Sequence, residues 1–191
     1  MPLYNTLINL RRELIRTFAV VDEWFDKEYS LRSFKPPSGG WSINEVLEHI
    51  MLTNHFLFVL IDKGKTKALK KREILAASFV VPEHYSLENR ALVEVSDPNL
   101  WPWHRPEHHQ PLGQRSMFDV RREIRDHLDG CLITLEELPN GEGTLHQTTM
   151  SVNNLGKLDV YQYVYFLALH AQRHLRQMER IEVEALKCLS V

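Results

Sequence analysis

The chain has 191 residues, 43% hydrophobic and 25% charged, a balance typical of a folded globular protein and not of a disordered or fibrous one. Its 23 Lys and Arg against 25 Asp and Glu leave a net charge of −2, which gives no general attraction for nucleic acid. Two cysteines exclude a disulfide framework or a zinc ribbon. No apolar run approaches the length of a membrane span, and residues 1–16 carry charges where a signal peptide would need its apolar stretch. We therefore expect one cytoplasmic domain over residues 1–191, with no nucleic-acid or membrane partner.

Four stretches carry apolar residues at intervals of three or four, the spacing that makes one apolar stripe on a helix. They predict helices over residues 3–25, 42–64, 116–138 and 159–181. Each of the last three opens with a capping signal, in which the first residue and one three positions later bind free backbone N–H groups. These pairs are Ser42 with Glu45, Ser116 with Asp119, and Asp159 with Gln162.

Residues 65–115 separate the second and third predicted helices. Part of this segment, near residues 67–79, is expected to form a short helix, and no stretch of the chain alternates convincingly enough to predict a strand. Long connections in compact domains are usually functional or cover something. The architecture that fits is all-α: a four-helix bundle with a long crossover between helices two and three.

Three of the ten histidines occupy informative positions. His170 and His174 are four residues apart, so both point to one side of the fourth helix, and that side carries its apolar stripe. Two neutral imidazoles at this spacing can ligate one metal ion. His49, which flanks the stripe of the second helix, is the best third ligand. Three histidines would leave a coordination position open, as in a catalytic metal site.

A His-x-x-x-His pair is also commonly a surface pair or a hydrogen-bonded core pair, and this alternative stays open. We expect His127 to be half-buried, and the histidines of residues 104–109 to be solvated. Any of these could also close the metal site as a fourth ligand, namely His104, His108, His109 or His127.

Several common catalytic signatures are absent: H-E-x-x-H, Glu-x-x-His, C-x-x-C, G-x-S-x-G, the P-loop and G-x-G-x-x-G. A basic run over residues 63–72 could receive an anionic cofactor or substrate, but such runs are usually solvated, and that is our expectation here. No residue is assigned a catalytic or cofactor-binding role from these patterns.

Two segments carry a family resemblance. Residues 41–50, Trp-Ser-Ile-Asn-Glu-Val-Leu-Glu-His-Ile, and residues 155–178, with Leu-Gly-Lys-Leu and then His170-Ala-Gln-Arg-His174, resemble the second and fourth helices of the DinB/YfiT-like superfamily. The resemblance implies an up-down-down-up four-helix bundle, often a homodimer. It also implies a divalent metal, commonly zinc or nickel, held by His49, His170 and His174. Some relatives are transferases or isomerases that use bacillithiol or mycothiol, and others are described as metal-dependent hydrolases.

Three functions follow from these observations. The first is a metal-dependent transferase that joins a low-molecular-weight thiol to a small electrophilic substrate. The second is a hydrolase using a metal-bound hydroxide, which also needs a general base; Glu45 is near His49 but has a competing capping role. The third is a non-catalytic metal-binding protein that acts in a stress response or through a partner. The shortage of a base favours the transferase. Gln177 and Thr53 are placed to orient the histidines through the other ring nitrogen, but we expect both to be ordinary interior polar residues.

Overall fold

The computed structural model describes residues 2–37, 39–87, 90–97, 110–150 and 155–189. Helices dominate the described residues: α1 (Leu3–Glu23), η1 (Trp24–Asp26), α2 (Tyr29–Ser33), α3 (Ile43–Leu75), η2 (Ala76–Ser78), α4 (Arg90–Val93), η3 (Glu94–Ser96), α5 (Met117–Glu137), η5 (Glu142–Leu145) and α6 (Val160–Leu189). Strands β1 (Gln147–Met150) and β2 (Gly156–Asp159) pair antiparallel, and β2 leads into α6. The expectation of an all-α protein is therefore correct in its main part.

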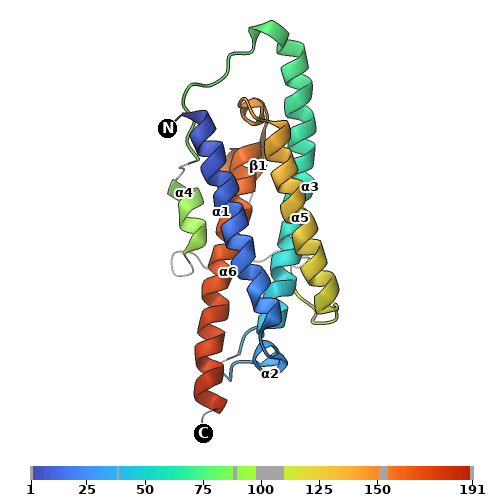
Figure 1. The fold of residues 1–191 in the computed structure, drawn as a ribbon, viewed down its shortest axis with the longest axis vertical. Helices are drawn as coiled ribbons and strands as arrows, with labels where there is room; N and C mark the ends of the chain where they lie inside the picture. Colours follow the sequence, from blue (N-terminus) through green and yellow to red (C-terminus); the bar gives the residue numbers. More distant parts are fainter. Residues whose placement is uncertain (1, 38, 88–89, 98–109, 151–154, 190–191) are drawn as a thin grey trace.

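Four long helices lie side by side. Helices α1 and α6 run in one direction and α3 and α5 in the opposite one (Figure 1). Helix α1 packs against α5 and α6, and α3 packs against the same two helices. The shared core is lined by the apolar stripes that the sequence displays, including Leu10, Leu14, Val46, Ile50, Leu57, Val120, Ile124, Leu167 and Met178. Among the described helices, none is both long and apolar enough to cross a bilayer.

Local capping sets the start of the two helices that carry the histidines. At α3, the Ser42 hydroxyl accepts from the Glu45 N–H at 3.3 Å, and the Glu45 carboxylate accepts from the Ser42 N–H at 2.8 Å. At α6, Asp159 and Gln162 exchange the same pair of bonds at 3.0 and 3.1 Å. Both predicted capping boxes are confirmed, so each helix begins where the sequence predicts, seven residues after Ser42 for His49 and eleven after Asp159 for His170.

Three details of the sequence prediction were wrong. Helix α3 does not end at residues 62–64 and is not followed by a separate short helix; it continues to Leu75. The strands β1 and β2 were not expected. At α5, Ser116 makes no side-chain capping bond, and Asp119 instead pairs with Arg122 at 2.8 Å.

The crossover between α3 and α5 is fastened to the bundle by polar contacts, three of them partly buried and one exposed. Glu48, beside His49, is 2% exposed and its carboxylate accepts from the backbone N–H groups of Gly113 at 2.8 Å and Leu112 at 3.4 Å. On the other side, Arg173 and Arg176 of α6 donate to backbone carbonyls of Asp97 and Ser96. The backbone is therefore held beside the histidine-bearing helices at Ser96 and Asp97, and again at Leu112 and Gly113.

Candidate metal centre

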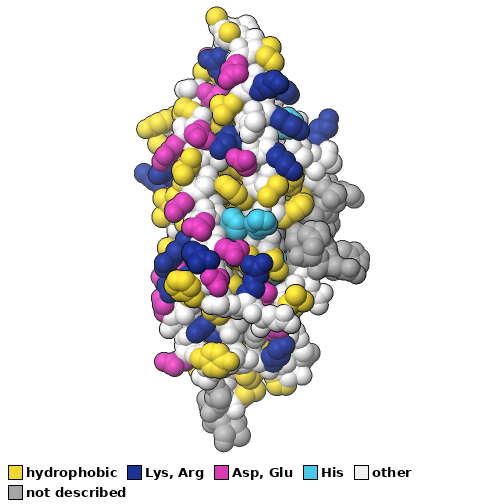
Figure 2. Space-filling model, turned by 90° about the vertical axis from the view of Figure 1, so that its right-hand side faces the viewer, with side chains coloured by type: hydrophobic (Ala, Val, Ile, Leu, Met, Phe, Trp, Pro, Cys, Tyr) yellow, Lys and Arg dark blue, Asp and Glu magenta, His cyan; other side chains and the backbone are white. Residues whose placement is uncertain are grey.

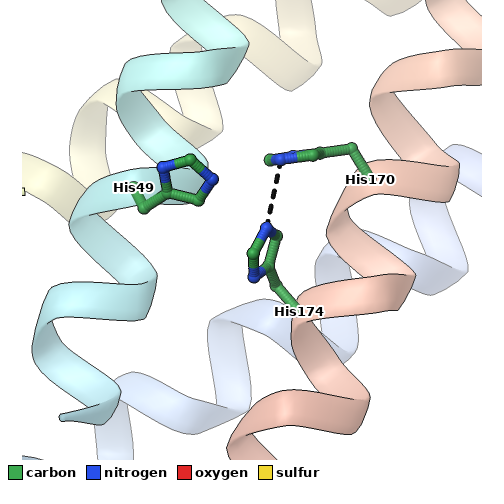
Figure 3. Close-up of side chains that lie close together, drawn as sticks. All are labelled: His49, His170 and His174. Atoms are coloured by element: carbon green, nitrogen blue, oxygen red, sulfur yellow. Dashed lines mark hydrogen bonds between the residues drawn. The ribbon is translucent and has the colours of Figure 1, made fainter. Parts of the chain in front are cut away.

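Three buried histidines meet between α3 and α6. His49 comes from the first half of α3, and His170 and His174 come from the middle of α6, with 3%, 2% and 7% of their surfaces exposed. Figure 3 shows the three rings directed into one space between the two helices. One possible ligand atom from each residue lies within 4.8 Å of the other two. The structure thus brings together the residues that the sequence nominates; metal binding by them stays a prediction.

The separations among these rings suit a shared ion. The Nε2 atoms of His170 and His174 are 3.1 Å apart, and the ring centroid of His49 is 5.2 Å from that of His170 and 4.7 Å from that of His174. Two nitrogens on a tetrahedral zinc, each about 2.05 Å from it, would be about 3.3 Å apart. Nitrogens at 3.1 Å therefore need little movement to share one ion.

Gln177 fixes the orientation of His174. Its amide oxygen lies 2.8 Å from Nδ1 of His174, one turn earlier on the same helix. Because an amide oxygen only accepts, Nδ1 carries the proton, and the Nε2 lone pair of the neutral ring faces the other two histidines. A hydrogen bond of this kind to a ligand histidine orients the ring and raises its basicity as a ligand. Gln177 thus takes the orienting position, so the expectation of an ordinary interior polar residue was wrong here.

Thr53, the other residue considered for orienting a histidine, does not do so. Its hydroxyl oxygen is buried and has no hydrogen-bond partner among the described residues. Aromatic rings instead lie against the other two histidines. The ring centroids of Trp41 and His49 are 4.8 Å apart, and Phe166 stacks on His170 with a centroid distance of 6.3 Å and an angle of 12° between the ring planes. Sequence reasoning missed both rings, although Phe166 precedes His170 by four residues, the spacing that places them on one helix face.

The nearby carboxylates are occupied elsewhere. Glu45 binds Ser42 and Lys35; although its partial burial acts to raise the pKa, the hydrogen bonds from these two residues leave it below the ordinary value. Glu48 holds the crossover backbone. Within the described part of the chain, the group that could hold a metal consists of the three histidines alone, without a carboxylate.

The other histidines do not join this group. His127 is 7% exposed, so the prediction of a half-buried residue was wrong. Its ring lies between α3 and α5, 5.6 Å from His55 and 5.8 Å from Phe58, and burial, followed by the proximity of His55, lowers its pKa. His104, His108 and His109 lie outside the described residues.

A comparison of the sequence with the profiles of known protein families assigns the chain to a family. The sequence profile of the DinB superfamily matches residues 9–178, a stretch that contains all three histidines. The chain belongs to the DinB superfamily. The resemblance noted in the sequence is thereby confirmed over nearly the whole chain, whereas comparisons with curated proteins and with solved structures give no match.

In this DinB-superfamily member, the donor set fits a divalent ion of the zinc, nickel, iron or copper type. Imidazole nitrogen suits all of these metals, whereas magnesium and calcium prefer oxygen ligands. Three candidate ligands, with no fourth histidine or carboxylate in the group among the described residues, would match the count found in catalytic sites and not in closed structural ones.

Proposed function

We propose that this protein binds one divalent metal ion, zinc or nickel, through His49, His170 and His174, and transfers a low-molecular-weight thiol to a small electrophilic substrate. The observation that carries the proposal is the buried group of three imidazoles drawn from two helices, with no fourth ligand among the described residues. Such a site keeps at least one coordination position for an exogenous molecule. A bound ion would supply one chemical effect that the chain lacks: it favours the thiolate form of a thiol.

The state of the carboxylates supports a thiol over water as the nucleophile. A hydrolase needs a general base within hydrogen-bond reach of the attacking water. Glu45 is held in its capping box and paired with Lys35, and Glu48 is committed to the backbone of the crossover. A thiolate needs no such base, because coordination favours loss of its proton.

The chain's own residues would position the reactants. Gln177 directs the Nε2 lone pair of His174 to the site, and the rings of Trp41 and Phe166 restrict His49 and His170. Helices α1 and α6 run in one direction, and α3 and α5 run in the opposite direction. This arrangement supports the up-down-down-up order of the proposed single DinB/YfiT-like domain. A homodimer and a cytoplasmic location remain predictions from the sequence.

The first test is metal content. Tag-free wild type should carry about one zinc or nickel ion per chain by elemental mass spectrometry, and His170→Ala should carry almost none. His127→Ala is the matched control, because His127 is also a buried helical histidine but lies outside the group. A wild type that holds no ion after incubation with either metal would refute the site.

The second test is turnover. The metal-loaded protein is incubated with a thiol, such as bacillithiol, mycothiol or glutathione, and the electrophile monochlorobimane, and separately with ester and amide substrates. Conjugation that depends on both thiol and metal supports the transferase. Turnover of esters or amides without thiol would replace it with the hydrolase, and full metal loading without either activity would leave a non-catalytic metal-binding protein.

A further inference from the structure

The C-terminal end of α3 projects beyond the rest of the bundle. The helix is held as far as Lys71, through an ion pair of Lys65 with Glu137 at 2.8 Å and a bond from Lys71 to the Leu145 carbonyl at 2.8 Å. Beyond this point α3 and the turn that follows it form the extreme end of the molecule in Figure 1. We define residues 74–81 as the tip.

The tip exposes apolar side chains in an ordered turn. Val80 is 81% exposed and Ile74 76%, and Val81 and Leu75 are also exposed. The turn itself is fastened locally: Arg72 donates to the Ala76 carbonyl at 2.8 Å and lies over the Phe79 ring, and Ser78 donates to the Leu75 carbonyl. Ala76 even takes a positive φ of 42°, which is rare for a residue with a Cβ. A fixed, projecting group of apolar side chains points to a binding role.

A row of exposed lysines leads to the tip. Lys63, Lys67, Lys70 and Lys71 lie within about 100° of one another around the helix, and Ile74 continues the same face, at about 100° per residue. None of the four lysines pairs with an acidic side chain in the described part of the chain, whereas Lys65, on another face, binds both Asp62 and Glu137. Like charges at this spacing repel one another and destabilise a helix. Binding of an anionic partner would relieve this repulsion.

The part of α3 that carries the lysine row has an excess of positive charge, because residues 62–73 hold six Lys and Arg against Asp62 and Glu73. Figure 2 shows Lys and Arg side chains over the upper part of the face that it displays, with Asp and Glu side chains among them. His146, in the segment after α5, feels the same field: burial lowers its pKa, and so do Lys67 and Lys71. Apolar tip and basic row are therefore adjacent parts of one surface.

We propose that the tip and the lysine row of α3 dock the protein on an anionic phospholipid surface. The apolar side chains of the tip would enter the boundary between headgroups and acyl chains, and Lys63, Lys67, Lys70 and Lys71 would face the acidic headgroups. Peripheral membrane binding commonly joins these two terms, buried apolar area and attraction to anionic lipid. A convex apolar end suits a deformable lipid surface, whereas a phosphate backbone alone would leave Ile74, Val80 and Val81 in water. The expectation of no membrane partner rested on the lack of a spanning segment, which surface docking does not need.

The test is co-sedimentation of the full-length wild type with sonicated vesicles of phosphatidylcholine alone or with 30% phosphatidylserine. We expect binding to the anionic vesicles only, weakening as NaCl rises from 0.1 to 0.5 M because salt screens exposed charges. Replacing Lys67, Lys70 and Lys71 by Gln should lower partitioning roughly 100-fold, at about fivefold per lysine. The matched charge control replaces Arg12, Arg16 and Lys187, which are exposed away from the tip, and should bind as the wild type does.

Apolar variants test the second half of the proposal. Ile74→Ser, Val80→Ser and Val81→Ser together should lower partitioning by about tenfold or more. The matched control, Val183→Ser with Leu186→Ser, removes exposed apolar side chains of α6 and should have no effect. Circular dichroism and metal content should be unchanged in all four variants, which separates a failure of docking from a failure of the metal site.

A fluorescent probe tests where the protein touches lipid. An NBD label on Ala77→Cys/Cys188→Ser should shift to the blue with anionic vesicles, while the same label on the exposed native Cys188 should not. The proposal is overturned if the wild type ignores anionic vesicles at 0.1 M NaCl, if the lysine variant binds them unchanged, or if the two labels respond alike. Binding to single-stranded RNA without binding to vesicles would assign the lysine row to nucleic acid instead.

Discussion

The bond from His174 to Gln177 offers the sharpest test of the candidate metal centre. Replacing Gln177 by Leu keeps the size of the half-buried side chain but removes the oxygen that lies 2.8 Å from Nδ1 of His174. Loss of a hydrogen bond of this kind typically lowers metal affinity 10- to 100-fold, or about 1.4–2.7 kcal/mol. The metal-free protein should lose only about 0.5–1.5 kcal/mol of unfolding free energy, the usual net value of one hydrogen bond. The effect on metal binding should therefore exceed the effect on stability.

Zinc affinity is measured by competition with a chromophoric chelator, and stability by urea unfolding of the metal-free protein. Gln177→Glu keeps an acceptor oxygen and should retain affinity within about threefold of the wild type. The control is Gln172→Leu on the same helix, which removes bonds to Glu13 and Thr17 without touching a histidine. Equal zinc affinity in Gln177→Leu and wild type, or an equal loss in Gln172→Leu, would refute the orienting role.

Three further predictions concern stability. A Cβ added at Gly130 would lie 2.3 Å from the Phe58 ring, so Gly130→Ala should lower the urea-unfolding free energy by about 1–3 kcal/mol despite its better helix propensity; an unchanged midpoint would contradict the packing. Hydrogen bonds from Arg121 hold the pKa of Asp22 in the folded protein well below its ordinary 3.8. The stabilisation by the ionised Asp22 is therefore complete above pH 3.8 and is lost as the pH falls through the lowered pKa of the folded protein. The difference in unfolding free energy between wild type and Asp22→Asn should accordingly shrink in urea titrations below pH 4. A difference that grows below pH 4 would contradict the lowered pKa of Asp22. Zinc at 100 times its Kd should add about 2.7 kcal/mol and raise Tm by about 5–11 °C in calorimetry, an increase that chelation abolishes and that His170→Ala should not show.

The features that could be predicted from sequence are those set within a few turns of one helix. The capping boxes at Ser42 and Asp159 involve residues three positions apart, so the pattern and the structure depend on the same local geometry. The side-chain direction of His170 and His174 follows from their phase against the apolar stripe. Placing His49 opposite them needed only the assumption that two apolar stripes face each other.

The features that escaped prediction depend on contacts far apart in the chain. In the sequence, Gly64 indicates the end of a helix. In the structure, a Cβ at this position would lie 3.2 Å from Val160, so the glycine instead permits the close approach of α3 to the start of α6. Glu48 has no distinctive local pattern, and the N–H groups that it binds, on Leu112 and Gly113, are 64 and 65 residues away. The strand residues Gln147–Met150 are too few to display an alternating pattern, and their strand partners are supplied by residues 156–159.

The unexpected length of α3 places two different surfaces on one element. His49 and Ile74 are 25 positions apart, which corresponds to about 37 Å along a continuous helix. Substitutions separated by much more than 10 Å and sharing no partner act independently. The lysine-to-glutamine variant should therefore bind zinc as tightly as the wild type, and His170→Ala should partition to anionic vesicles as the wild type does. If loss of the metal instead changed vesicle binding more than about threefold, the two ends of α3 would be coupled, and docking at the tip would be a response to occupancy of the metal centre.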